Sequence, residues 1–246
     1  CITNYFSIPT RFYRNDSGTY TLLNTPFSTA TTNIANCWGD YDNDGDLDVI
    51  ITNDNAPTRY YRNDAGSFVY LSGGLTTPTA TNGAVNGDYD NDGDLDVFFN
   101  GLGNNGNNTS VGLYKNETVA GNRNWVNLKL NGTFSNRSAL GAIIRIKSTI
   151  NGVPVWQMRE VNAQNSFQGQ NDLRVHFGLG NAQQIDSIII KWPKGLTEVF
   201  TTKAANKFYN VTEGQGISEI IIGISQINTN IPERTVLNQN YPNPFN

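Results

Sequence analysis

The sequence contains few of the residues on which metalloenzymes and redox proteins usually depend. Its 246 residues include one histidine, His176, and two cysteines, Cys1 and Cys37. The cysteines do not have the spacing of a zinc or thiol redox motif, so neither chemistry has support in the sequence. A disulfide between Cys1 and Cys37 is left open. No nucleophile elbow, phosphate-binding loop or H-E-x-x-H segment occurs either.

Long apolar runs and dense charge are also absent. The longest apolar run lies around Ile220 to Ile224, far short of the roughly 20 residues that a membrane-spanning helix needs. No basic run of the kind that binds nucleic acid is present. Charged residues make up 15% of the chain, whereas asparagine, threonine, serine and glycine are abundant. This composition predicts an exposed, turn-rich, all-β protein.

Acidic residues are concentrated in two short segments. Ten of the 21 aspartates and glutamates lie within Asp40–Asp48 and Asp88–Asp96. The rest of the chain holds 11 acidic residues against 17 basic ones, a surplus of six positive charges. The negative charge is therefore local, and two divalent cations would cancel the formal net charge of -4.

The N-terminal half of the chain contains internal repeats. Pro9–Asp16 recurs as Pro57–Asp64, and Gly39–Val49 recurs as Gly87–Val97, both at an offset of 48 residues. A weaker third copy occupies Leu113–Glu117. Repeats of this length with short β-segments are typical of propeller blades. Two and a fraction blades cannot close a propeller, which needs about four or more.

The start of the chain falls inside the repeat. Ile2–Asn4 matches Ile51–Asn53, the segment that follows the first acidic segment. We expect further repeats upstream, so that residues 1–121 form the C-terminal part of a longer array. Strand edges that a partial array leaves open must be covered by something.

The two acidic segments have the residue pattern of calcium loops. Calcium takes six to eight oxygen ligands, and a tight loop offers them at alternate positions. Positions 1, 3 and 5 supply side-chain oxygens, a glycine at position 6 permits the turn, and position 9 closes the shell, with both carboxylate oxygens. Position 7 contributes a main-chain oxygen. The predicted metal ligands are Asp40, Asp42, Asp44, Asp46 and Asp48 around Gly45, and Asp88, Asp90, Asp92, Asp94 and Asp96 around Gly93.

Two alternatives to such a calcium loop were weighed. An EF-hand needs an acidic residue at position 12, where this chain has Ile51 and Phe99, and strand-like segments follow both loops. A solvated acidic turn without a metal is the other alternative. Because no nearby lysine or arginine relieves the carboxylates, we expect the metal-free loops to be disordered. The predicted role of the ions is structural rather than signalling, with a dissociation constant of roughly 0.1 to 1 mM.

The C-terminal half has the alternation of a β-sandwich. Val126, Leu128 and Leu130 are predicted to face inward, whereas Asn127 and Lys129 face outward. Similar patterns separated by turn signals continue to about residue 213, which predicts a sandwich of roughly 90 residues. The predicted domains are residues 1–121 with the repeats, 122–214 with the sandwich, and 215–246 with a strand and a Pro/Asn-rich tail.

His176 and the tryptophans were considered as functional residues. His176 alternates with apolar neighbours, so we place it on the outer face of a strand and predict that the protein is not an enzyme. The four tryptophans could stack on sugars, although core packing is favoured: Trp38, Trp125, Trp156 and Trp192.

Both halves resemble known modules. The loop sequence Gly-Asp-Tyr-Asp-Asn-Asp-Gly-Asp-Leu-Asp followed by Tyr-Arg-Asn-Asp resembles FG-GAP or VCBS repeats, the blades of integrin-like β-propellers. Residues 122–213 resemble the ASPIC/UnbV domain of proteins similar to cartilage acidic protein, on the basis of Asn131–Arg137 with Gly141-Ala142, Phe177–Gly180 and Lys191–Gly195. The resemblance implies an extracellular calcium-binding protein, often adhesive, with no established reaction.

The last residues resemble a secretion signal. Leu237–Asn246 is similar to the start of the C-terminal sorting signal of bacterial type IX secretion substrates. This resemblance implies export followed by surface attachment or release. An ordinary Pro-rich linker is the alternative.

Two functional hypotheses follow. In the first, the chain is a structural subunit of a bacterial surface that self-assembles into a fibre or sheath, through open strand edges and donation of Ile217–Ile227 to a neighbour. In the second, a monomeric adhesin presents its calcium-stiffened loops to a carbohydrate or a protein.

Overall fold

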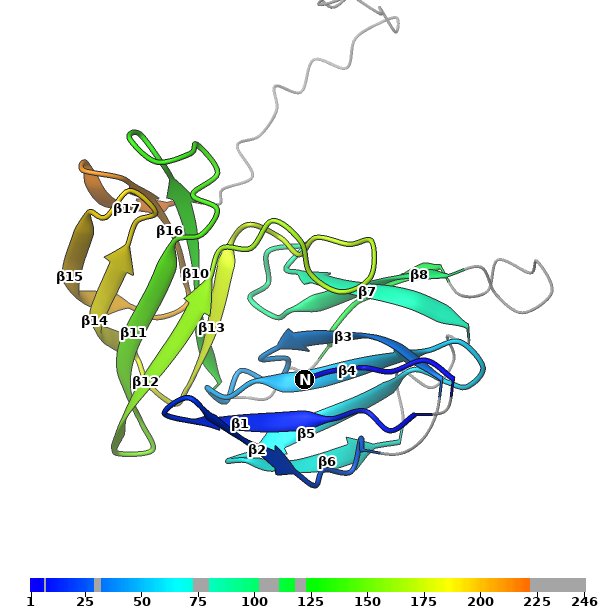
Figure 1. Cartoon of the computed structure of the whole chain (residues 1–246). Coiled ribbons are helices and arrows are strands. Elements are labelled where there is room, and N and C mark those ends of the chain that lie inside the picture. Colours follow the sequence, from blue (N-terminus) through cyan, green and yellow to red (C-terminus); the bar gives the residue numbers. More distant parts are fainter. Residues whose placement is uncertain (7, 29–31, 73–79, 102–110, 118–122, 222–246) are drawn as a thin grey trace, which may run out of the picture.

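Every regular element that the structure describes is a β-strand. The computed structural model describes residues 1–6, 8–28, 32–72, 80–101, 111–117 and 123–221, and these form seventeen strands without a helix (Figure 1). The predicted all-β class is confirmed. No helix capable of crossing a membrane occurs within these ranges.

The repeats form three antiparallel sheets. The first sheet has two strands, the second four and the third three. Their strands are β1 (Phe12–Asp16) and β2 (Thr19–Leu23); β3 (Asn33–Gly39), β4 (Asp48–Asn53), β5 (Arg59–Asp64) and β6 (Ser67–Leu71); and β7 (Thr81–Gly87), β8 (Asp96–Gly101) and β9 (Gly112–Tyr114). The β3–β4 hairpin recurs 48 residues later as β7–β8, as the sequence repeat predicts. Each hairpin loop is one of the acidic segments.

Small apolar clusters join these propeller-like sheets. Phe27, Val49, Ile51 and Tyr61 pack between the first and second sheets, with Phe12 and Trp38 against them. A second cluster joins the second and third sheets: Cys37, Tyr41, Ile50, Ala84, Leu95, Val97 and Phe99. Cys37 is buried and Cys1 is exposed, and both are free thiols.

The third sheet has an open side. Tyr41 is 5% exposed because the third sheet covers it, whereas its repeat equivalent Tyr89 is 53% exposed. Among the described residues, no further blade follows to cover Tyr89. The second acidic segment is therefore open to solvent at Tyr89, where the first is covered; the open strand edges of a partial array stay a prediction.

The second half is a sandwich of two four-stranded sheets. One has the order β13-β10-β16-β17 and the other β12-β11-β14-β15. The strands are β10 (Asn124–Asn131), β11 (Ile143–Ile150), β12 (Val153–Glu160), β13 (Val175–Gly180), β14 (Gln184–Lys191), β15 (Thr197–Ala204), β16 (Lys207–Thr212) and β17 (Gly216–Ile220). Val126, Leu128 and Leu130 lie in one continuous core with residues of both sheets, as predicted.

The tryptophans pack in different ways. Trp192 is buried in the sandwich core, and Trp125 lies edge-on to Phe208 with 4.8 Å between ring centroids. Trp38 stacks on Phe12. Trp156 is 45% exposed, with the guanidinium of Arg145 over its ring. Core packing therefore holds for Trp192 and Trp38, whereas Trp125 is partly buried outside the core clusters and Trp156 is exposed.

The segment predicted to be donated to a neighbour begins inside this chain's own sheet. Gly216–Ile220 forms β17 and pairs antiparallel with β16, Phe208 opposite Ile220. The prediction that Ile217–Ile227 leaves the subunit is therefore wrong for residues 217–220, because β16 offers an open edge in the same chain. Residues 222–246, including the segment that resembles a secretion signal, lie outside the described residues.

One buried carboxylate fixes the loop that follows β10. The main-chain N–H groups of Thr133, Phe134 and Ser135 all donate to Oε2 of Glu213, at 2.9, 2.9 and 2.7 Å. The Ser135 hydroxyl donates to Oε1 at 2.8 Å. Burial alone would raise the pKa of Glu213, but these donors lower it. The residue thus holds the Asn131–Arg137 segment against the end of β16.

We predict that Glu213→Ala destabilises the sandwich. Buried donors left without an acceptor cost about 1 to 3 kcal/mol each, and only the Ser135 donors are fully buried, whereas Thr133 and Phe134 are more exposed. A total of about 3 kcal/mol, or roughly 6 to 12 °C in melting temperature, is therefore expected. Thermal unfolding followed by circular dichroism measures this. Glu219→Ala, which removes an exposed partner of Lys207, is the matched control. Equal melting temperatures for the two variants would contradict the prediction.

Candidate metal centres

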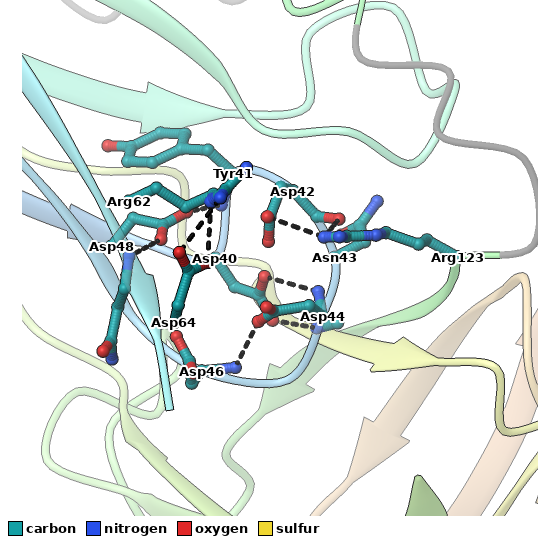
Figure 2. A network of polar contacts seen from close by, with 12 residues as sticks. Asp40, Tyr41, Asp42, Asn43, Asp44, Asp46, Asp48, Arg62, Asp64 and Arg123 are labelled. Carbon is teal, nitrogen blue, oxygen red and sulfur yellow. Dashed lines mark hydrogen bonds and ion pairs between the residues drawn. The ribbon is translucent and has the colours of Figure 1, made fainter. Parts of the chain in front are cut away.

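The two acidic segments adopt the same turn. We name residues 40–48 the first aspartate loop and residues 88–96 the second aspartate loop. In the first, the N–H groups of Asp44 and Gly45 donate to the Asp40 carboxylate at 3.1 and 3.0 Å (Figure 2). In the second, the equivalent groups donate to Asp88, both at 3.1 Å. Gly45 and Gly93 have φ angles of 106° and 98°, which side chains disfavour, so the glycine at position 6 is required by the turn.

Three carboxylates converge in each loop. Oxygens of Asp40, Asp42 and Asp48 lie within 4.8 Å of one another, and so do those of Asp88, Asp90 and Asp96. These are positions 1, 3 and 9 of the predicted pattern. The first group is wholly buried, whereas Asp90 in the second is exposed. The spacing of the five aspartates is identical in the two loops, so it could not predict that the two sites differ in exposure.

The first loop holds buried oxygens that have no donor. Oδ1 of Asp42 and Oδ1 of Asp46 are buried without any hydrogen-bond partner. A buried carboxylate oxygen without a donor is costly, and a hard cation removes that cost by accepting the oxygen as a ligand. The residues present therefore fit a calcium ion.

Positions 5 and 7 are used differently from positions 1, 3 and 9. Oδ1 of Asp44 accepts the N–H of Asp46 at 3.0 Å, and Asp92 accepts that of Asp94 at 3.1 Å. The Asp46 carboxylate accepts the N–H of Ala65 at 2.9 Å. The Asp46 side chain is thus engaged outside the loop. A main-chain contribution from Asp46 and Asp94 stays a prediction.

The last aspartate of each loop is held by an asparagine that lies on β5 in the first case and just after β9 in the second. Asp48 Oδ1 accepts the N–H of Asn63 at 2.8 Å, and Asp96 Oδ1 accepts that of Asn116 at 2.8 Å. The amide groups of Asn63 and Asn116 donate to the main chain at Leu47 and Leu95. Each aspartate loop is followed in the sequence by a Tyr-Arg-Asn or Tyr-Lys-Asn segment. The asparagine of that segment anchors the aspartate at position 9 of the loop.

Basic residues approach both loops, contrary to the sequence prediction. Arg123 lies 2.6 Å from the Asp42 carboxylate (Figure 2). Lys115 lies 3.0 Å from Asp90 and 3.5 Å from Asp92. Both cations come from later parts of the chain, so a search of sequence neighbours could not find them. They neutralise part of the negative charge but leave the buried oxygen of Asp42 without a donor.

Burial makes the loops resist ionisation when no cation is bound. It raises the pKa of Asp48 to about 7 and those of Asp46, Asp88 and Asp94 to about 6. Nearby aspartates add to the effect at Asp46 and Asp94. Ionised carboxylates at neutral pH therefore favour a bound divalent cation.

Two protein families match the parts of the chain described above. Residues 40–99, which hold both loops, match the family described as FG-GAP-like repeat, and residues 132–218 match ASPIC and UnbV. The chain combines an FG-GAP-like repeat with an ASPIC and UnbV domain. The resemblance to both modules is confirmed. No curated protein sequence matches the chain.

A solved structure also matches the chain, with low similarity. It is a crystal structure described as a "putative cell adhesion protein" from Bacteroides ovatus, matched over 85% of this chain and 76% of that chain. The identity is 10% and the TM-score 0.27, values too low to carry an argument about this chain.

Two residues of the sandwich lie on a buried face, contrary to the prediction from sequence alternation. Asn127 and His176, predicted to face outward, are 2% and 6% exposed. Asn127 donates to Asp88 at 3.3 Å, and Nε2 of His176 lies 3.1 Å from the Gly93 carbonyl oxygen. The prediction was wrong because the FG-GAP-like repeat covers this face of the sandwich. Burial lowers the pKa of His176 to about 3, so the ring is neutral at physiological pH.

We predict that the calcium-free protein is more stable at pH 5 than at pH 8. The loop carboxylates have folded-state pKa values of about 6 to 7, above about 3.9 in the unfolded chain. The folded state then binds more protons, so this stabilisation is complete below the unfolded pKa and is lost as the pH rises through 6 to 7. His176 opposes the trend, but it is one group against four.

Melting temperatures of protein stripped of calcium measure this. Saturating calcium should reduce the difference between the two pH values, because the ion keeps the carboxylates ionised. A calcium-free melting temperature that is higher at pH 8 would contradict the prediction.

Proposed function

We propose that the chain is a calcium-binding module of an extracellular surface protein. The observation that carries the proposal is the convergence of three carboxylates in each of two matched loops, with a buried Asp42 oxygen that has no donor. Asp40, Asp42 and Asp48 would hold one ion, and Asp88, Asp90 and Asp96 the other. The ions supply positive charge that the loops lack.

The proposed role of calcium is structural. The blades of the FG-GAP-like repeat have only small apolar clusters, and each aspartate loop closes a hairpin at the end of a blade. An ion that ties positions 1, 3 and 9 together would fix the hairpin where apolar packing is thin. We propose no catalytic step: neutral His176 is engaged by the second aspartate loop.

Titration calorimetry with calcium tests the binding proposal. Two sites are expected, with dissociation constants of roughly 0.1 to 1 mM. Asp42→Asn is expected to remove one site and Asp90→Asn the other. Asp186→Asn, which alters an exposed acid on the sandwich that accepts from Thr149, should leave both. Absence of calcium binding by the unmodified chain would refute the proposal.

For the assembly we propose a self-associating subunit of a fibre or sheath. The exposed side chain of Tyr89 supports this, since exposed apolar surface favours association between copies. A bacterial surface location and secretion through the C-terminal segment belong to the same proposal. The alternative is a monomeric adhesin for a carbohydrate or a protein, which the exposed Trp156 beside Arg145 favours.

Light scattering separates the two candidates. A chain shortened after Ile221 keeps every described strand, including β17, and loses the remaining residues. If the shortened chain polymerises as readily as the full chain, the C-terminal segment does not drive assembly. Calcium-dependent binding of a monomer to immobilised glycans would support the adhesin instead.

A further inference from the structure

Both aspartate loops lie against the same strand of the sandwich. β13, with its neighbour β10, is on the side of the ASPIC and UnbV domain that faces the FG-GAP-like repeat (Figure 1). The N–H of Gly178 donates to Asp40 Oδ2 at 3.1 Å, and the N–H of Gly180 donates to the carbonyl oxygen of Asn43 at 2.8 Å. Two residues before Gly178 in β13, Nε2 of His176 lies 3.1 Å from the carbonyl oxygen of Gly93 in the second loop.

The period of the strand explains how one element serves both loops. Residues at every second position of a strand share a face, so 176, 178 and 180 point the same way. His176 meets the second loop, and Gly178 and Gly180 meet the first. From β10, Asn127 adds a bond to Asp88 at 3.3 Å. The first ligand of each predicted metal site, Asp40 or Asp88, is therefore hydrogen-bonded by the sandwich.

The aspartate loops and the sandwich approach each other so closely that several contact positions leave no room for a Cβ atom. A Cβ on Gly178 would lie 2.2 Å from Asp40 Oδ2 and 2.6 Å from the main chain of Asn43. A Cβ on Gly93 would lie 1.9 Å from the Trp125 ring, and one on Gly45 would lie 2.6 Å from Ile150. Three glycines thus allow the loops and the sandwich to meet without intervening side chains.

Basic residues from outside the repeat surround the loops as well. Arg123 pairs with Asp42, and Arg174 donates to Asn91 and to the main chain of Asp88. Burial lowers the pKa of the partly buried Arg159, and the charge of Asp40 opposes that change. The residues outside the repeat therefore present N–H donors and positive charge to the loops, including to the predicted ligands Asp40, Asp42 and Asp88.

From this geometry we infer that the two calcium sites are the joint between the domains. The sandwich positions Asp40 and Asp88 for the ions, and the bound ions in turn hold the loops in the shape that β13 and β10 recognise. Binding of calcium and docking of the sandwich are then coupled, and the coupling is reciprocal by linkage. Asn127, His176 and Gly178 are positioning residues that act through the ligands. The inference rests on the proposed calcium binding.

Two variants at the two loops test the joint, each the control for the other. Gly178→Ala pushes a methyl group against Asp40 and should weaken calcium binding at the first loop at least tenfold. Asn127→Leu removes the donor to Asp88 at similar volume and should weaken the second loop alone. Gly112→Ala changes a strand glycine whose Cβ would have only ordinary contacts, and both affinities should be unchanged. Calorimetry gives the affinities.

Hydrogen exchange supplies a readout of the joint that does not depend on affinity. In the full chain, calcium removal should speed exchange at the amides of Gly178 and Gly180 at least tenfold, while amides of Ile146 and Ile188 in the sandwich core exchange as before. The core amides also report whether each variant is folded. Asn127→Leu should speed exchange near the second loop even if Gly178→Ala proves too disruptive to fold.

The possible failures are distinguishable. If the unmodified chain binds no calcium, the proposed function fails and the inference falls with it. If calcium binds but both variants keep full affinity at both loops, the coupling between the sites and the sandwich is refuted and the calcium sites stand. The same conclusion follows if calcium does not change the exchange rates of the Gly178 and Gly180 amides. Selective loss at the matching loop, together with calcium-dependent exchange at β13, supports the inference.

Discussion

Removal of calcium is expected to lower the melting temperature of this protein by roughly 10 to 20 °C. At a calcium concentration about 100 times the dissociation constant, each ion stabilises the folded chain by about 2.7 kcal/mol. Two independent ions give about 5 kcal/mol, and about 1 kcal/mol corresponds to roughly 2 to 4 °C for a chain of this size. The physical cause is the cost of holding Asp40, Asp42 and Asp48 ionised and buried without a cation.

Differential scanning calorimetry in calcium at about 100 times the dissociation constant and in excess chelator measures the shift. Restoring calcium after the chelator should restore the melting temperature, which separates metal loss from damage. Magnesium at the same concentration should restore less, because it demands a smaller, octahedral set of ligands. An unchanged melting temperature in chelator would contradict the structural role.

Asp48→Ala is expected to have the largest effect of any single loop substitution. Asp48 accepts from the N–H of Tyr41 and the hydroxyl of Tyr60, both at 3.0 Å, and from the N–H of Asn63 at 2.8 Å. Removing the carboxylate leaves these donors unsatisfied and removes a ligand of the first site. The expected loss is at least about 4 kcal/mol, or roughly 8 to 16 °C.

The matched control is Asp16→Ala, which removes an exposed aspartate that pairs with Arg14 near the end of a β-hairpin. Its melting temperature should be nearly unchanged, because exposed ion pairs contribute little. Thermal melts in calcium compare the two, and calorimetry should find a single remaining calcium site in Asp48→Ala. Equal melts for the two variants would rule out the anchoring role of Asp48.

Much of the local structure could be predicted from the sequence. The 48-residue repeat predicted the recurrence of the β3–β4 hairpin as β7–β8, and glycine at position 6 predicted the turn at Gly45 and Gly93. Alternation placed Val126 and Leu128 in the core. These features depend on residues close together in the chain, where spacing determines which side chains share a face.

The interface between the domains was beyond the reach of sequence patterns. Alternation puts Asn127 and His176 on the face opposite the core, and such a face is normally exposed. Here another domain covers it, so both residues are buried against the second loop. Arg123, which approaches Asp42 from 81 residues away, could not be found from local spacing either.

Glu213 shows a partial signal that was missed. An acidic residue at the end of an alternating strand invites a search for donors, and the Asn131–Arg137 segment supplies three main-chain N–H groups. That segment carried the resemblance to the ASPIC and UnbV domain. Its partner lies 78 residues away from Ser135 and only the fold brings the two together.

A crystal structure determined in calcium, with anomalous diffraction to locate the ions, tests the central claim most directly. The account predicts one peak in each aspartate loop, with carboxylate oxygens of Asp40, Asp42 and Asp48, and of Asp88, Asp90 and Asp96, at about 2.3 to 2.6 Å. Peaks missing from both loops, with the carboxylates hydrated instead, would contradict it.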